Sequence, residues 1–325
     1  MESALRTVLG PGAFRMILAM MVFVSHMSLW HIGTPAVTVF LMLSGYWVSR
    51  IYIERKYDGV GAYLMGRVMR LWPMVIVAAI VAFAIQMGVR GAPIGNFWST
   101  VFFLGLASRR NDIVGTVWSL DIELQFYAAL PFVLAGLAMA GARWKPALVI
   151  GALLGLGAGI LLGKLGAVTA LLFAPAFAAG IWLEKTQWVP SRRLALLSLA
   201  AFAVALVTYA KLMPRDVREV MAMDISHFNL GTLLVAITVV PFVAWNVHVK
   251  SDKRDRWLGD LSYPFYLLHF PIIYGMTQLM GHSLLMKGSA LAVTIIVTVL
   301  VNLLIDQPLE RWRRSRLAAR PAPAE

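Results

Sequence analysis

Long apolar runs separated by short polar connections make up most of the sequence. A helix that crosses a hydrocarbon core of roughly 30 Å needs about 20 mostly apolar residues, and ten stretches meet this requirement. They lie near residues 14–31, 34–53, 68–89, 117–140, 146–163, 166–184, 193–211, 229–248, 258–280 and 286–305. The pattern predicts an all-α integral membrane protein, a bundle of about ten transmembrane helices without a soluble domain.

One shorter apolar piece, NFWSTVFFLGLA at 96–107, is too short to span and is expected to form a re-entrant or interfacial helix. No convincing small-residue cleavage site follows the first apolar run, so this run is expected to be a retained helix. We therefore predict a single membrane domain over 1–325, with its helical part at about 14–312 and a disordered cytoplasmic tail at 313–325.

Composition agrees with a membrane-embedded chain. Of 325 residues, 60% are hydrophobic and 14% are charged, where soluble domains have about a quarter charged. The net charge of +13 raises the question of nucleic acid, but the basic residues fall in short connections, where they encode membrane topology. No nucleic-acid partner is expected. The absence of cysteine excludes disulfides, thiolate metal sites and a thiol nucleophile.

The distribution of basic residues predicts the orientation. With ten spans, 21 of the 29 Lys and Arg residues fall on the side of the N-terminus and 8 on the other side. Cytoplasmic connections carry the excess of positive charge, so both termini are expected in the cytoplasm.

Two acids interrupt the fourth apolar run, in the stretch VWSLDIELQFY. A carboxylate at mid-membrane costs roughly 2.5–3.5 kcal/mol on insertion scales, which makes it a functional candidate. Glu123 shares a helix face with Ser119 and Tyr127, whereas Asp121 lies about 200° away, on the side of Gln125. We expect Glu123 to be functional and Asp121 to reach water near the outer end.

The first predicted helix carries Arg15 and His26, eleven residues apart and therefore on one face, about 16 Å from each other. Counting from the predicted helix ends puts His26 and Glu123 at the same depth, which predicts a His–carboxylate pair. Arg67 and Arg70, expected at the start of the third helix, would join Arg15 on the cytoplasmic side, where guanidinium groups can hold phosphates bidentately.

The ninth predicted helix carries a second polar face. Ser262, Tyr266 and His269 recur at helical spacing, with Tyr263 nearby, and His269 falls near mid-membrane. These side chains are expected to line the internal site or to pair across helices.

In chain order these motifs resemble the membrane acyltransferase-3 family. They are the Arg15–His26 spacing, FLMLSGYWVSR at 40–50, RVMRLWP at 67–73, VWSLDIELQFY at 117–127 and LSYPFYLLHFP at 261–271. The resemblance covers nearly the whole chain, and it departs at Asp121, Leu124 and the segment Asp306-Gln-Pro308. It implies a multi-pass protein of the bacterial inner membrane that transfers an acyl group, most often acetyl, from acyl-CoA to a hydroxyl of a carbohydrate or glycolipid. Membrane lipid and polysaccharide-assembly proteins are further implied partners.

The resemblance also implies roles for particular residues. His26 would be the general base, oriented by Glu123, with a transient acyl-His26 as the mechanistic rival. The acyl-CoA site would hold Arg15, Arg67, Arg70, Ser44, Tyr266 and His269. The acceptor would contact Trp118, Ser119, Tyr127, Ser262 and Tyr263. Topology alone can also explain Arg67 and Arg70, and an aromatic belt can explain Trp118.

Other interpretations remain open at this stage. A transporter or flippase would use the same buried polar residues as a proton or substrate path. Within the enzyme class, the acceptor can instead be a small secreted metabolite. A metal site is not expected, because His26 and His31 are five residues apart without a further ligand set. His31, His227, His248 and His282 are expected to play no part in the chemistry.

Overall fold

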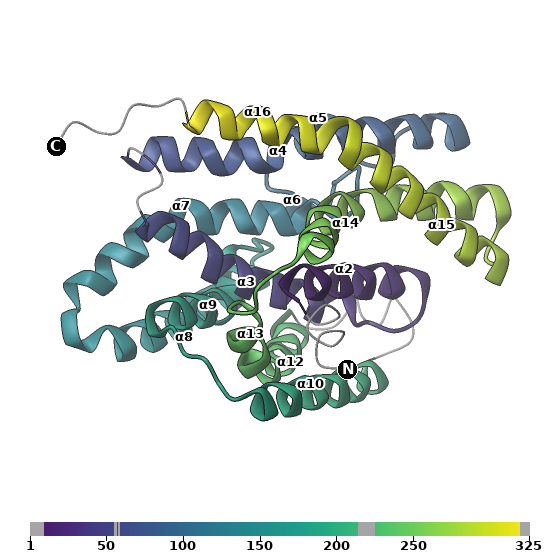
Figure 1. The fold of residues 1–325 in the computed structure, drawn as a ribbon. Helices are drawn as coiled ribbons and strands as arrows, with labels where there is room; N and C mark the ends of the chain where they lie inside the picture. Colours follow the sequence, from purple (N-terminus) through teal and green to yellow (C-terminus); the bar gives the residue numbers. More distant parts are fainter. Residues whose placement is uncertain (1–9, 55–56, 58, 214–224, 319–325) are drawn as a thin grey trace.

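The computed structural model describes residues 10–54, 57, 59–213 and 225–318, and helices account for most of them (Figure 1). The N-terminal part comprises α2 (Pro11–Met27), α3 (Gly33–Ile53), α4 (Gly59–Arg90), α5 (Phe97–Val101), α6 (Leu106–Arg109), α7 (Trp118–Met139), η1 (Gly141–Arg143) and α8 (Trp144–Lys164). The C-terminal part comprises η2 (Ala170–Phe173), α9 (Ala174–Thr186), α10 (Arg192–Leu212), α12 (Ile225–Thr238), α13 (Val240–Asn246), α14 (Lys253–Met280), α15 (Leu284–Val301), a π-helical turn η3 (Asn302–Asp306) and α16 (Gln307–Ala318). Within the described residues, β-pairing is limited to one isolated bridge between Asn96 and Asp112.

The all-helical prediction is confirmed for the described part of the chain, and each of the ten predicted stretches falls on helix. Among the residues that the structure describes, six helical segments are long and apolar enough to cross a membrane: Gly33–Ile53, Gly59–Arg90, Trp118–Met139, Gly141–Lys164, Arg192–Leu212 and Leu284–Arg313. The other four predicted stretches do not meet the same requirement for length and hydropathy, each for a reason that the structure shows. Helix α2 has 17 residues, α9 has 13, α12 and α13 are separated at Val239, and α14 opens with a charged turn.

Several helices run beyond the apolar windows that predicted them. Helix α4 begins at Gly59 rather than near residue 68, so Arg67 and Arg70 lie in its third and fourth turns and not at its start. Helix α16 continues to Ala318, six residues past the predicted end of the helical part, and 319–325 lies outside the described residues. A helix can continue through polar residues because its backbone hydrogen bonds do not depend on apolar side chains, so hydropathy does not predict where such a helix ends.

The short apolar piece at 96–107 forms α5 and α6 instead of one helix. The Asn96 side chain accepts a hydrogen bond from the Ser99 N–H at 2.8 Å and caps α5. The chain then turns at Gly105, whose φ of 66° is left-handed.

Helices α2 and α14 lie against each other and come to very short range at the start of both helices. A Cβ at Gly12 would lie 1.7 Å from the Asp255 carbonyl oxygen, so only glycine permits this approach. Asp255 also binds α2 through its side chain, which accepts hydrogen bonds from the N–H groups of Gly12 at 3.2 Å and Ala13 at 2.8 Å. Small residues at such crossings let backbones approach inside membranes, where packing drives helix association.

Helices α3 and α9 form a second close crossing. A Cβ at Gly180 would lie 2.1 Å from the Met42 carbonyl oxygen, and one at Gly45 would lie 2.4 Å from the Phe177 carbonyl oxygen. Together the two crossings fix α2, α3 and α14 around a common interior.

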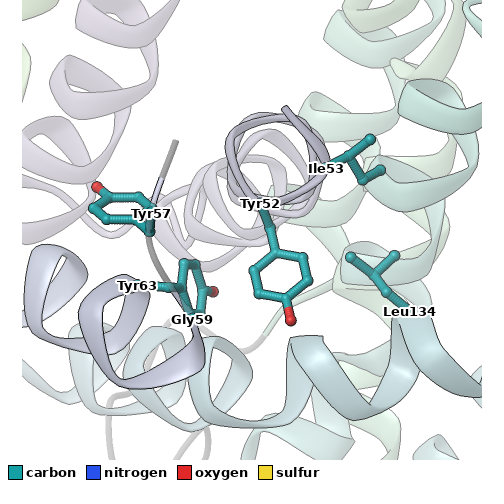
Figure 2. Close-up of a pocket in the computed structure, with 6 residues that line it drawn as sticks. All are labelled: Tyr52, Ile53, Tyr57, Gly59, Tyr63 and Leu134. Carbon is teal, nitrogen blue, oxygen red and sulfur yellow. The ribbon is translucent and has the colours of Figure 1, made fainter. Parts of the chain in front are cut away.

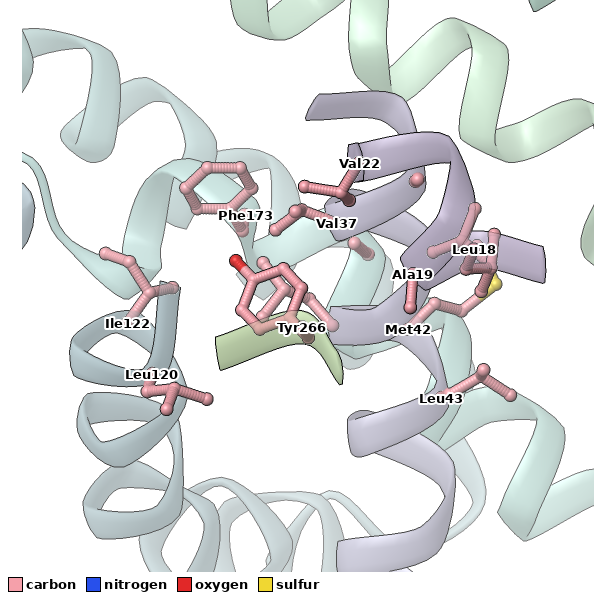
Figure 3. Packing of buried hydrophobic residues seen from close by; sticks show 14 of the residues in the cluster. Leu18, Ala19, Val22, Val37, Met42, Leu43, Leu120, Ile122, Phe173 and Tyr266 are labelled. Atoms are coloured by element: carbon pink, nitrogen blue, oxygen red, sulfur yellow. The ribbon is translucent and has the colours of Figure 1, made fainter. Parts of the chain in front are cut away.

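Tyr266 of α14 occupies that interior (Figure 3). The figure shows its ring between Leu120 and Ile122 of α7 and Val37 of α3, with Val22 of α2 nearby. All these side chains are buried. The packed centre therefore joins α2, α3, α7 and α14, four of the five helices that carry the sequence-predicted polar residues; the fifth is α4, with Arg67 and Arg70.

Candidate functional site

Two histidines from different helices meet at the core of the molecule. The Nδ1 of His26, in the last turn of α2, lies 3.0 Å from the Nε2 of His269 on α14. The rings are nearly parallel, with an interplanar angle of 17° and centroids 5.1 Å apart. His269 is fully buried, whereas His26 is exposed.

His26 lies on the side of α2 that packs against the bundle. His26 falls within about 40° of the buried Ala19 and Val22 around the helix, and about 180–200° from Ile17 and Val24. Ile17 and Val24 are exposed and apolar, as a lipid-facing side requires. His26 therefore combines a bundle-facing position in the last turn of α2 with an exposed side chain.

The predicted pairing of His26 with Glu123 is wrong. Glu123 accepts hydrogen bonds from the Ser44 hydroxyl of α3 and from the Tyr127 hydroxyl at 2.5 Å. The side chain that is hydrogen-bonded to His26 is His269. Equal depth on two helices does not fix the direction in which each face points, and here α14 lies against α2.

Ser119 and Tyr266 link α7 to α14 between these two groups. Their hydroxyl oxygens lie 2.7 Å apart, and each also lies within hydrogen-bond distance of the Thr116 carbonyl oxygen. Each hydroxyl has one hydrogen, so one of them donates to the other hydroxyl and the second donates to the carbonyl. The Tyr266 ring in turn lies 6.0 Å from the His269 ring. Because Ser119 precedes Glu123 by one turn on the same face, the histidine pair and the Glu123 group form two ends of one polar interior.

Asp121 does not reach water, contrary to the prediction. The side chain is buried, accepts a hydrogen bond from the Ala107 N–H at 3.0 Å and holds the Gln125 side chain at 3.4 Å. Gln125 accepts in turn from the Ala170 N–H at 2.9 Å. The carboxylate thus ties α6 and the η2 segment to α7, which is a structural role.

Asp112 serves the loop before α7 in a similar way. Its carboxylate accepts from the N–H groups of Val114 at 2.8 Å and Val117 at 2.5 Å. Burial raises the pKa of Asp112, and these backbone donors oppose the rise.

The three predicted arginines do not form one cluster. Arg67 is buried and donates to the Tyr57 hydroxyl at 2.8 Å, while Arg70, exposed on a neighbouring face of α4, lies within electrostatic range of Arg15. The Nε groups of Arg15 and Arg67 are buried and have no hydrogen-bond partner among the described residues. Orphaned guanidinium donors of this kind are available to a ligand.

Two cavities open at one end of the bundle, where α2, α4 and α14 begin and α3 ends. The first, of about 390 Å³, is lined by Tyr52, Ile53, Tyr57, Gly59, Tyr63 and Leu134 (Figure 2). Figure 2 shows the three tyrosine rings gathered around the start of α4. The buried Tyr63 hydroxyl has no hydrogen-bond partner in the part of the chain that the structure describes, and it lies within electrostatic range of Arg67 and Glu123.

The second cavity, of about 340 Å³, is strongly polar. Its walls are Gly12, Arg15, Ser251, Lys253, Arg256, Trp257 and Asp260. Sequence reasoning identified Arg15 but missed Lys253, Arg256 and Trp257, because SDKRDRW at 251–257 reads as an ordinary basic connection between membrane helices.

The remaining predicted residues have structural partners. Ser262 donates to the Gly259 carbonyl of its own helix at 2.7 Å, and Tyr263 donates to the Leu71 carbonyl at 2.8 Å. The Trp118 ring packs 6.5 Å from that of Phe173. His248 bonds to the Ala244 carbonyl and His282 is exposed, both away from the histidine pair. The side chain of His227 lies outside the described residues.

Potential metal ligands do not gather in threes among the residues that the structure describes. The chemistry available at the core therefore comes from one accessible imidazole, a buried second imidazole and a separate hydroxyl–carboxylate group.

Comparison with known families agrees with this membrane bundle. Residues 9–306 match the model of the acyltransferase 3 family, which is described as an acyltransferase domain. The chain belongs to this family, which makes it a multi-pass membrane acyltransferase. No curated protein and no solved structure matches the chain.

Proposed function

We propose that this protein transfers an acyl group, most commonly acetyl, from acyl-CoA to a hydroxyl of a carbohydrate acceptor, with His26 as the general base. The observation that carries the proposal is the exposed imidazole of His26, which is held at 3.0 Å by the buried His269 on the bundle-facing side of α2. Family membership supports acyl transfer as the class of reaction.

The donor side of the proposal rests on Arg15. This residue opens into the polar cavity beside Lys253 and Arg256, which offers three cations to the phosphates of a nucleotide. Trp257 in the same wall offers an aromatic face to the adenine ring. Because Arg15 and His26 share a face of α2, the thioester arm has to cover about 16 Å between them. Both cavities would be cytoplasmic with the N-terminus inside, which is where acyl-CoA is found.

The reaction itself needs one proton shuttle. The His26 imidazole takes the proton of the acceptor hydroxyl, whose oxygen attacks the thioester carbonyl. The carbon–sulfur bond breaks and the imidazolium returns the proton to the departing thiolate, giving an ester and free CoA. Positioned general-base catalysis typically contributes 10²–10⁴-fold to the rate.

Glu123 takes a different place in this proposal than the sequence predicted. Its network with Ser44 and Tyr127 lies in electrostatic range of Tyr63, which lines the tyrosine cavity. We propose that this network, together with Arg67, shapes the interior beside the tyrosine cavity, where the donor would enter, and that it does not orient His26.

The test uses purified protein in lipid vesicles with radiolabelled acetyl-CoA and a panel of acceptors that includes glycans, lipid-linked sugars and small secreted metabolites. The proposal expects acceptor-dependent release of CoA and label in a base-labile ester, both lost in His26→Ala. Transport of an acceptor without any ester formation would replace this proposal with a transporter. Label that remains on the protein without acceptor would indicate an acyl-His26 intermediate.

A further inference from the structure

The hydrogen bonds of His269 determine which of its nitrogens carries a hydrogen. Its Nδ1 lies 3.2 Å from the Phe265 carbonyl oxygen of the preceding helical turn. A carbonyl oxygen can only accept, so Nδ1 must be the donor. A neutral imidazole has a single N–H group, which leaves the Nε2 of His269 with a lone pair.

The surroundings of His269 favour the neutral ring. The side chain is fully buried, and its ring neighbours are Phe23, Phe265 and Tyr266. The residues in hydrogen-bond contact with it, His26 and Phe265, offer no carboxylate to balance an imidazolium. Burying an unpaired charge is far more costly than burying a neutral hydrogen-bonded ring.

The orientation of His26 follows from that of His269. Because Nε2 of His269 can only accept, Nδ1 of His26 must donate across the 3.0 Å contact. The lone pair of His26 is then on Nε2, at the side of the ring that His269 does not cover. Phe270 packs edge-on against the same ring, with centroids 4.8 Å apart, and limits its rotation.

We propose that His269 is a positioning residue that fixes His26 in its Nδ1–H tautomer and so leaves Nε2 to take the acceptor's proton. This inference rests on the proposed function for the identity of the proton, but the tautomer can be observed without turnover. In the serine-protease arrangement a carboxylate holds the imidazole in this way. Here a buried neutral ring does so, and it supplies orientation without a balancing charge.

The positioning role of His269 agrees with the way in which its ring is fixed by its neighbours. The Phe265 ring stacks on it with an interplanar angle of 14°, and Tyr266, one turn along, is anchored to Ser119 of α7 at 2.7 Å. A side chain needed only to fill space would not require a ring nitrogen aimed at an accessible histidine.

Two substitutions separate positioning from packing. His269→Gln presents an acceptor oxygen near the place of Nε2, whereas His269→Leu fills similar space without an acceptor. We expect His269→Leu to lower kcat about 10²-fold with the KM for acetyl-CoA within about twofold of wild type, in line with the loss of a residue that orients a catalytic group. His269→Gln should recover most of that loss. His282→Leu, at an exposed histidine without contacts to the site, is the matched control.

The tautomer is read directly from nitrogen NMR of protein labelled at its histidine ring nitrogens, with the His26 signals assigned by difference from His26→Ala. The inference expects a protonated Nδ1 and an unprotonated Nε2 on His26 in wild type, and a mixture of tautomers in His269→Leu. A wild-type His26 protonated at Nε2 would overturn it, and so would equal kcat in the Leu and Gln variants. Absence of turnover in wild type with the expected tautomer would instead overturn the proposed function alone.

Discussion

The carboxylate of Asp255 accepts hydrogen bonds from the first-turn N–H groups of α2, at 2.8 Å from Ala13 and 3.2 Å from Gly12, across 242 and 243 residues of sequence. A residue at the start of α14 thereby caps the helix that carries Arg15 and His26. The cap positions the arginine of the polar cavity relative to the other wall of that cavity.

Removing this cap should destabilise the protein. We expect Asp255→Ala to lower the free energy of unfolding by about 1–3 kcal/mol, because two buried N–H groups lose their acceptor and the positive end of α2 loses a negative charge. Thermal unfolding in detergent measures the loss. Asp255→Asn keeps an acceptor oxygen and should lose less than half as much. Equal stability of wild type and Asp255→Ala would contradict the cap.

Changing Glu123 tests the separation of the acid from the histidine pair. We expect Glu123→Gln to lower kcat by less than about tenfold, because the amide oxygen still accepts from Ser44 and Tyr127. A carboxylate that directly oriented a catalytic histidine would cost about 10⁴-fold when replaced. Steady-state kinetics in vesicles distinguish the two. Tyr127→Phe should combine non-additively with Glu123→Gln, since both act in one hydrogen-bond network.

Asp121 should matter for folding and not for chemistry. We expect Asp121→Leu to cost about 1–3 kcal/mol in stability, because the buried Ala107 N–H and the Gln125 amide lose their acceptor. The kcat of the folded fraction should stay within about twofold of wild type. Asp121→Asn, which retains an oxygen, serves as the control. A large drop in kcat with unchanged stability would assign Asp121 to the reaction.

The polar cavity predicts a donor-specific effect of Arg256. We expect Arg256→Ala to raise the KM for acetyl-CoA about fivefold, corresponding to roughly 1 kcal/mol for a partly solvated charge contact. The KM for acetyl-pantetheine, which lacks the nucleotide phosphates, should not change. Higher ionic strength should reduce the difference between variant and wild type. An equal effect on both donors would place the nucleotide elsewhere.

The crossing of α3 and α9 predicts intolerance of a single methyl group. Gly180→Ala puts a Cβ 2.1 Å from the Met42 carbonyl oxygen and should cost at least about 1–3 kcal/mol through forced backbone movement. Gly157→Ala, on the exposed side of α8 with open space around it, should be neutral or stabilising by up to about 1 kcal/mol. Thermal unfolding of the pair in one detergent provides the comparison, and equal melting temperatures would contradict the crossing.

Helix content followed from the sequence because apolar runs of this length leave few alternatives in a membrane. Helix ends were less accessible, as α4 shows, since the hydropathy signal fades where the backbone remains helical. The ten-span count also exceeds the six segments of the described chain that satisfy length and composition, because α2, α9 and α14 are short or partly polar and the 229–248 stretch divides into α12 and α13.

Side-chain partners were the least predictable part of the site. Spacing placed Ser119, Glu123 and Tyr127 on one face, and Tyr127 does bind Glu123. Residue spacing did not predict that α14 lies against α2 and brings His269 to His26. The depth of a residue in the membrane can be counted along its own helix, but it does not indicate which helices are neighbours. The spacing of Asp121 and Gln125 indicated a local contact, but their hydrogen bonds to Ala107 and Ala170 depend on the path of distant loops.

The placement of Arg15 and His26 on a single helix has a mechanical consequence. In the proposed function Arg15 anchors the donor and His26 reacts with it. Because one helix carries both residues, they move together when neighbouring helices shift to admit or release a substrate. The proposed function therefore implies a constant span between the two groups throughout the cycle, so that α2 would select donors by the length of their arm rather than by the acyl group they bear.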